Sequence, residues 1–285
     1  MTSRARLNLA LLITLGGLAL IIYLLPEKNS QIALTTLDPE KIADMGVQRA
    51  GQTPIRLRLG RDGWRVTRPF DAPANIARIG TLLKLAGKTS HQRYAVDDLD
   101  LSQYGIDPDS TRILLNGETI VIGNVNPVTR QRYAQAGGLL HVITDDIIDL
   151  GAADAGSFVT LKLLPEDAKI ETLSLPALQL ERQDDSNWKV SSAESEPEGD
   201  SVENLVSAWQ NARAVWAEQM EAGSAAQEIA ITLAGGEELR FEIVTEQPEL
   251  VLRQVDLNVA YHLVAEDAVV LLGHGLSRVA DDHGQ

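Results

Sequence analysis

The feature that most constrains this chain is an uncharged segment of nineteen residues near its start, Leu7 to Leu25. At about 1.5 Å of rise per residue, a helix of that length spans roughly 28 Å, close to the ~30 Å hydrocarbon thickness of a bilayer. Arg4 and Arg6 precede the segment, while Glu27 and Lys28 cancel after it. This charge bias predicts a single membrane crossing with a cytoplasmic N-terminus. We therefore expect a membrane anchor with the soluble part on the far side of the membrane.

A cleaved secretory signal peptide is the alternative interpretation of this segment. Signal peptides have apolar cores of about 7 to 15 residues and a small-residue cleavage site. This core is longer, and Pro26 to Asn29 follow it. The comparison favours an uncleaved signal anchor over a cleaved peptide and over a helix buried in a soluble domain. Because the chain contains no cysteine, disulfides and lipoprotein acylation are excluded.

Charge is distributed unevenly along the chain. The formal net charge is −15 at pH 7, which argues against nucleic-acid binding by the chain as a whole. Residues 29–151 contain 14 acidic and 14 basic side chains, whereas residues 152–285 contain 25 acidic and 8 basic ones. We expect a neutral, arginine-bearing half near the membrane and a strongly acidic half farther from it.

Two segments of similar pattern indicate an internal repeat. Each begins with a β-hairpin pattern, in which the second strand opens with Trp64 or Trp188. An amphipathic helix pattern follows at 71–88 and at 200–221, and further hairpin patterns come after it. Matching residues are separated by offsets of 121 to 124. Such constant spacing is typical of tandem copies of one unit.

The repeat predicts an α+β fold, in which an N-terminal transmembrane helix precedes two tandem repeats of mostly antiparallel sheet packed on a helix, each of order β-β-α-β-β-β-β-α. The expected divisions are 1–28 for a cytoplasmic stub and anchor, 29–151 for the first module, and 152–285 for a second, diverged and acidic module. One continuous α+β domain is the alternative.

Three segments outside the repeated pattern have their own signals. Asp38 to Gly46 has Asp, Pro and Gly at the positions that begin and end a short helix. Ser90 to Ser110 is expected to be an insertion found only in the first module. Ser191 to Gly199 is rich in Pro, Glu and Ser, which favours a loop.

Several motifs in the first module resemble a known family. They read DGWRVTRP, then YAVDDLDLSQYGIDP, then ETIVIGNVNPVTRQRYAQ and LLHVITDDIIDLG, and lie between Ile55 and Gly151. Together they resemble the bacterial family catalogued as domain of unknown function 4340. The resemblance implies an envelope protein with one N-terminal membrane segment and, as in some members, an association with ABC-type transport systems. It implies no activity and no site residues.

Arginines form the clearest candidate contact site. On an alternating strand, Arg56 and Arg58 share one face, so a cationic stripe is expected that would contact anionic head groups or a partner protein. The alternative is that these arginines form ion pairs with Asp62, Asp71 or the acidic second module. The series comprises Arg56, Arg58, Arg61, Arg65 and Arg68 on one hairpin, with Arg130 and Arg132 near another.

Histidines are weaker candidates. His141 and His262 occupy matching positions in the two copies, and a pair that titrates near neutral pH or binds a metal is one interpretation. A solvent-facing strand position is the alternative, because no further ligands lie at suitable spacing.

An acidic run and the tryptophans complete the candidates. Asp97, Asp98 and Asp100 with His91 would form an acid/base or cation site, or else a solvated helix start. The four tryptophans are expected to lie in the core, with a carbohydrate platform as the alternative.

No motif for nucleophilic catalysis or phosphate binding occurs in the chain, and no cofactor is expected. The sequence favours a non-enzymatic, membrane-anchored accessory or scaffold protein that contacts an envelope complex, such as an ABC-type transporter. A hydrolase of an envelope polymer or lipid, and a ligand sensor that uses the cleft between the repeats, are the alternatives.

Overall fold

The fold is described from a computed structural model. The structure describes residues 14, 16, 32–146, 153–184, 187–192, 199–223 and 227–274. The expected anchor, Leu7 to Leu25, lies outside this part except for Thr14 and Gly16. Within the described residues, no helix combines the length and the apolar composition that a membrane crossing requires.

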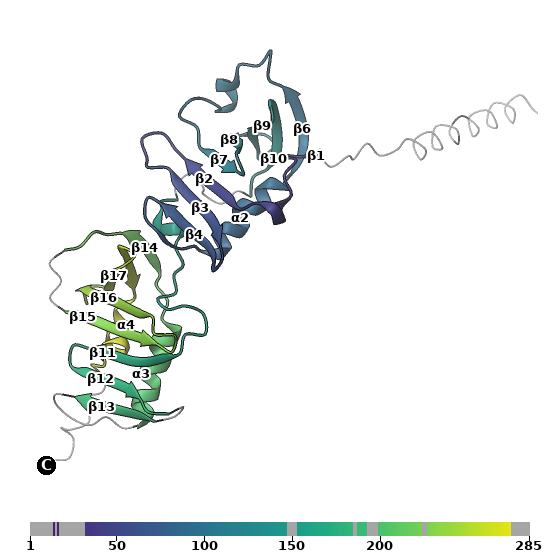
Figure 1. The fold of residues 1–285 in the computed structure, drawn as a ribbon. Coiled ribbons are helices and arrows are strands. Elements are labelled where there is room, and N and C mark those ends of the chain that lie inside the picture. The colour runs from purple at the N-terminus through teal and green to yellow at the C-terminus, as the bar shows by residue number, and fades with distance from the viewer. Residues whose placement is uncertain are drawn as a thin grey trace, which may run out of the picture.

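The first half of the described chain forms a ten-stranded antiparallel sheet (Figure 1). Its strand order is β1-β6-β10-β9-β8-β7-β2-β3-β4-β5. One helix, α2 (Ile76–Ala86), covers one face and buries Ile79, Leu82 and Leu85 against the sheet. The strands are β1 (Ile32–Ala33), β2 (Asp44–Gln48), β3 (Ile55–Gly60), β4 (Gly63–Arg68), β5 (Ala72–Pro73), β6 (Thr89–Ala95), β7 (Arg112–Leu115), β8 (Glu118–Val125), β9 (Gln131–Ala136) and β10 (Leu139–Thr144).

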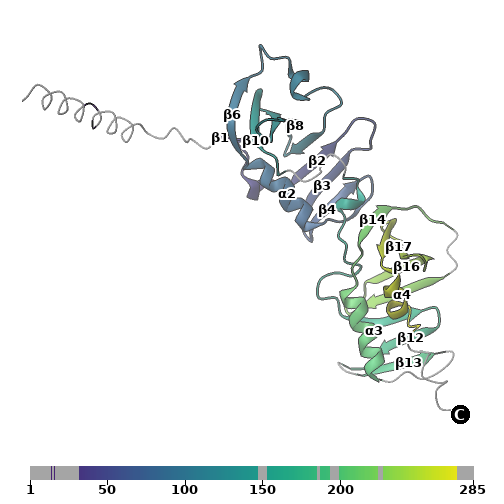
Figure 2. The ribbon, with the colours of Figure 1, turned by 180° about the vertical axis from the view of Figure 1, so that it is seen from behind.

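The second half forms an eight-stranded antiparallel sheet of order β13-β12-β11-β15-β16-β17-β18-β14. Two helices, α3 (Gly199–Asn211) and α4 (Ala265–Leu271), lie on the same face of it (Figure 2). Trp209 of α3 is fully buried, and its Nε1 donates a hydrogen bond of 2.9 Å to the carbonyl of Leu271. The strands are β11 (Ile170–Leu175), β12 (Leu178–Arg182), β13 (Trp188–Ser192), β14 (Trp216–Gln219), β15 (Glu228–Leu233), β16 (Glu238–Thr245), β17 (Leu250–Gln254) and β18 (Val259–Leu263).

The two sheets share one strand order. Read from β4 to β6, the first sheet runs β4-β3-β2-β7-β8-β9-β10-β6, and the second runs β13-β12-β11-β15-β16-β17-β18-β14. In each sheet, three consecutive strands are followed by a helix, after which the chain enters the sheet at its other end, in β6 or β14. The predicted α+β class with mostly antiparallel sheets is confirmed. The predicted order β-β-α-β-β-β-β-α is wrong in detail, because an extra strand precedes each hairpin (β2 or β11) and five strands, not four, follow each helix. The first sheet also gains the short strands β1 and β5.

Several elements have other bounds than the sequence predicted. Asp38 does cap a helical turn, but that turn is a 3-10 segment, η1 (Pro39–Lys41), and β2 begins soon after it. The segment predicted as an insertion at 90–110 contains most of β6 and the 3-10 turn η2 (Leu101–Tyr104). The helix predicted to reach residue 221 ends at Asn211, because Trp216 already pairs with β18. The helix expected at the end of the first module and the loop at 191–199 lie mostly outside the described residues.

One extended segment, the connector at 156–164, joins the two sheets. It begins with the 3-10 turn η3 (Gly156–Phe158). Val159 then forms an antiparallel bridge with Ala74 of the first sheet, and Lys162 forms one with Arg213 beside the second sheet. Four backbone hydrogen bonds of 2.7 to 3.2 Å support these bridges, two on each side. Because the connector forms backbone hydrogen bonds beside both sheets, it holds the two sheets next to each other at their edges.

Candidate functional site

Four arginines of the hairpin β3–β4 lie on one face of the first sheet. In the strand register Arg56 is opposite Arg68, and Arg58 is opposite Arg65. Residues directly opposite each other in a sheet project to the same side, so the predicted cationic stripe is present as a cluster of side chains. Between them, Ile55, Leu57 and Val66 project to the other side and are buried beneath α2. We call these four residues, Arg56, Arg58, Arg65 and Arg68, the arginine face.

Three members of the arginine face form ion pairs. Asp44 on β2 accepts hydrogen bonds from Arg56 at 3.2 Å and from Arg58 at 2.9 Å. Asp71 pairs with Arg65 at 2.7 Å. The alternative interpretation is therefore confirmed for one pair, Arg65 with Asp71. The role of Asp44 was missed by sequence reasoning, because that residue lies in the stretch predicted to be a helix.

Two exposed arginines of this hairpin lie outside these ion pairs, Arg61 in the turn and Arg68 on β4. Among the described residues, neither has an ion pair or a side-chain hydrogen bond. Residues 44–73 contain six arginines and three aspartates, so this part of the sheet carries a net charge of +3 on a strongly acidic chain.

Arg130 and Arg132 do not join the arginine face. Arg132 lies on β9, which is separated from β3 by three strands, and it projects to the same side as its partner Ile143. Its guanidinium donates to Asp145 at 2.6 Å and to the carbonyl of Gly123 at 2.8 Å, which fixes the neighbouring loop. Arg130 has a φ of 59° in the exposed turn before β9.

The two histidines are both buried, so the alternative of a solvent-facing position is wrong. His141 is 2 % exposed and His262 is 6 % exposed. They are also not equivalent. His141 pairs with Ala134 on the helix side of the first sheet, whereas His262 projects to the open side of the second. Tyr261 occupies the position in β18 that corresponds to His141 in β10. His262 is one residue later, and a shift of one residue moves a side chain to the other face of the sheet.

His262 nevertheless lies in a polar cluster. Its Nδ1 is 2.9 Å from a carboxylate oxygen of Glu249, and its Nε2 is 3.3 Å from one of Glu218. The imidazole stacks on the indole of Trp216, with ring centroids 3.5 Å apart. Within the described residues, no group of three or more acidic or histidine side chains is arranged to hold a metal ion.

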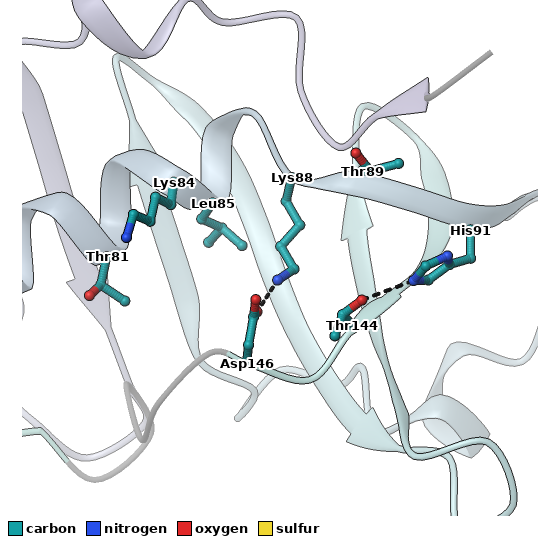
Figure 3. A pocket seen from close by; sticks show the side chains of 8 residues that line it. All are labelled: Thr81, Lys84, Leu85, Lys88, Thr89, His91, Thr144 and Asp146. Carbon is teal, nitrogen blue, oxygen red and sulfur yellow. Dashed lines mark hydrogen bonds and ion pairs between the residues drawn. The ribbon is translucent and has the colours of Figure 1, made fainter. Parts of the chain in front are cut away.

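A cleft of about 430 Å³ opens between the C-terminal end of α2 and the end of β10 (Figure 3). Lys88 points across it to Asp146, with which it forms an ion pair, and His91 contacts the hydroxyl of Thr144 at 2.9 Å. Burial lowers the pKa of Lys88 below its usual range, and the nearby charge of Asp145 opposes that shift. The cation that crosses the cleft, Lys88, is already neutralised by Asp146.

The predicted acidic site at 97–100 does not form. Asp100 caps η2 by accepting hydrogen bonds from the backbone and hydroxyl of Ser102, at 3.2 and 2.6 Å. These bonds lower the pKa of the Asp100 carboxyl. His91 bonds to Thr144 instead of to the aspartates. The carboxylate is therefore a helix cap, which agrees with the interpretation as a helix start.

The tryptophans largely occupy the core, as expected. Trp209 is fully buried, while Trp64 and Trp188 are partly buried and pack against the core. Arg182 lies over the ring of Trp188, 4.4 Å from its centroid. Trp216 is the exception, because 43 % of its surface is exposed.

Comparison with known proteins gives one match. Neither the curated proteins nor the solved structures contained a match to this chain. A family model, described as Domain of unknown function (DUF4340), matches residues 64–250. The match runs from β4 to β17, so it extends beyond the first module, where the resemblance was seen, and takes in most of the second sheet. The chain belongs to the family described as Domain of unknown function (DUF4340).

Proposed function

We propose that this chain is a non-enzymatic accessory or scaffold protein of the bacterial envelope. In this proposal, Leu7 to Leu25 anchors it in the inner membrane, and two tandem modules with one strand order project into the periplasm. A partner complex, such as an ABC-type transporter, would be contacted by the module surfaces. Tethering raises the effective concentration of the modules near a membrane partner, so that weak contacts suffice.

The arginine face is the observation that carries this proposal. It lies on the side of the first sheet that α2 leaves uncovered, and Arg61 and Arg68 have no ion pair among the described residues. Exposed cations near a bilayer attract anionic head groups by about 1 kcal/mol each. We therefore assign the arginine face to contact with an anionic surface, either of lipid or of a membrane-embedded partner.

Two other functions have less support. A hydrolase would need convergent acid and base groups, but Asp100, the best candidate, is a helix cap. A sensor would need a ligand cleft between the modules, whereas the connector fills the place where the two sheets approach, with Phe158 and Val159 fully buried.

Vesicle sedimentation tests the arginine face. Residues 29–285 are mixed with vesicles containing anionic lipid, and the bound fraction is compared between variants. The double variant Arg61→Ser, Arg68→Ser is expected to bind severalfold more weakly. Asp44→Asn is expected to bind more strongly, because it leaves Arg56 and Arg58 without their acidic partner.

The matched control is Arg78→Ser with Lys84→Ser. It removes the same charge from α2, on the opposite side of the sheet. Equal losses in both double variants would show a response to net charge alone and would contradict a specific face. The partner proposal has a separate test, in which the full-length protein is cross-linked in its membrane and purified. Recovery of the protein without a stoichiometric membrane partner would count against a scaffold.

A further inference from the structure

A second pocket of the first sheet has the composition of a ligand site. It measures about 590 Å³ and lies on the helix side of the sheet, where the chain leaves β1. Its lining comes from separate places in the sequence, which only the folded sheet brings together. The lining residues used below are Leu34, Arg93, Glu118, Ala136, Leu139 and His141.

Opposite charges line the same pocket. Arg93 on β6 is directly opposite His141 on β10 in the strand register. Glu118, at the start of β8, is 3.4 Å from the hydroxyl of Thr36, a contact that leaves most of its carboxylate capacity unused. No ion pair joins Arg93 or Glu118 to another group among the described residues. Both charges are therefore open to a ligand.

His141, which lines this pocket, has a buried polar atom without a hydrogen-bond partner among the described residues. Only 2 % of its surface is exposed, yet its Nδ1 has no hydrogen-bond partner within the part of the chain that the structure describes. Buried polar atoms in native proteins are rarely left without a partner. Burial, with the nearby charge of Arg93 as a lesser cause, lowers the pKa of His141. The neutral ring can donate one hydrogen bond and accept another.

Apolar side chains form the rest of the wall. Leu34 and Ala136 are buried at 3 % and 4 % exposure, and Leu139 is partly exposed beside them. A pocket with an apolar body and a few polar groups of fixed position is typical of small-molecule sites, and its volume lies in their usual range of about 300 to 1,000 Å³.

We propose that this pocket binds a zwitterion with an apolar side chain, of the class of an apolar amino acid or short peptide. Arg93 would bind the carboxylate, and Glu118 would bind the ammonium group. Leu34, Ala136 and Leu139 would contact the side chain. This site is separate from the arginine face, which lies on the other side of the sheet, and the proposal does not depend on membrane docking.

Calorimetric titration of the full chain in detergent micelles with L-leucine tests the proposal. Saturable binding is expected. N-acetyl-L-leucine lacks the ammonium group and L-leucinamide lacks the carboxylate, so each is expected to bind about tenfold more weakly, the effect of one lost charge contact of about 1.4 kcal/mol. Binding of N-acetyl-L-leucine as tight as that of leucine would overturn the zwitterion assignment in favour of a simple anion site.

Variants locate the site. Arg93→Gln is expected to weaken leucine binding about tenfold and to abolish the preference for leucine over leucinamide. Glu118→Gln should abolish the preference over N-acetyl-leucine in the same way. Arg93 is exposed and Glu118 is partly exposed, so neither change is expected to prevent folding. Arg240→Gln, an equal change on the second sheet, should leave binding unaltered. The proposal fails if no saturable binding of leucine is seen, or if binding survives both pocket variants.

Discussion

The imidazole of His262 stacks on the indole of Trp216, with ring centroids 3.5 Å apart and ring planes 15° apart. The two residues are direct neighbours in the register of β18 and β14. His262 is thus held between an aromatic ring and the carboxylates of Glu249 and Glu218. It fixes the edge strand β14, against which the connector turn η3 also packs.

Replacing His262 by alanine should destabilise the second sheet. The change removes two hydrogen bonds and the stacking partner of Trp216, and the expected loss is about 1 to 3 kcal/mol in the free energy of unfolding. Urea unfolding measures it. His91→Ala is the control, because His91 is exposed and its side chain contacts the hydroxyl of Thr144, so its expected effect is within about 0.5 kcal/mol. Equal effects of the two changes would contradict a structural role for the His262 cluster.

Gly156 should tolerate no side chain. A Cβ at this position would lie 1.9 Å from the carbonyl oxygen of Ala217 on β14. Gly156→Ala must therefore separate η3 from the second sheet, and a loss of several kcal/mol in unfolding free energy is expected. Gly80 provides the matched control. It lies inside α2, and a Cβ added there would meet nothing within 4 Å, so Gly80→Ala should stabilise the protein by about 0.5 to 1 kcal/mol. Similar effects of both changes in a thermal unfolding experiment would refute the tight contact.

Patterns local to one element were predictable from the sequence. The alternation of Ile55 and Leu57 with Arg56 and Arg58 indicated the hairpin and placed the arginines on one face, because strand periodicity depends only on neighbouring residues. The apolar face of α3 was predictable for the same reason. Trp216 was assigned to that helix because it continues the helical spacing from Trp209, although the chain turns into a strand between them.

Relationships between distant strands were not predictable. Asp44 pairs with two arginines only because β2 lies beside β3, and its own neighbours in sequence resemble a helix start. The matching of His141 with His262 was wrong because an offset of 121 is one residue too long at that strand, and one residue reverses the face. The pocket that contains Arg93, Glu118 and His141 has no sequence signal, since its residues come from β6, β8 and β10.

Acidification should reduce the stability of the first sheet through His141. Its pKa in the folded protein is lowered by burial from an ordinary value of 6.5. The unfolded chain therefore takes up a proton at a higher pH than the folded one. The contribution of neutral His141 is fully present above about pH 6.5 and is lost progressively as the pH falls toward the folded-state pKa.

Unfolding in urea at pH 7.5 and at pH 5.5 measures this linkage. The loss of unfolding free energy between the two values should be smaller in His141→Gln than in the natural protein, whereas between pH 7.5 and 8.5 the two should change in parallel. An identical loss on acidification in both proteins would show that His141 is not the group responsible.

Arg253 should contribute far more to stability than Arg240, although both arginines form ion pairs in the second sheet. Arg253 is only 3 % exposed and donates to Glu242 at 2.7 Å and to Asn258 at 2.8 Å. Arg240 pairs with Asp256 at 2.9 Å, but both side chains are about half exposed. Water screens the second pair, whereas removal of the buried Arg253 leaves the partly buried carboxylate of Glu242 without its partner. Arg253→Ala is expected to lower the unfolding free energy by about 3 to 5 kcal/mol, and Arg240→Ala to lower it far less. Urea unfolding at low and at high salt distinguishes the two, because added salt should weaken the effect of Arg240→Ala and leave that of Arg253→Ala nearly unchanged. Effects of equal size and equal salt dependence would show that burial does not separate these two pairs.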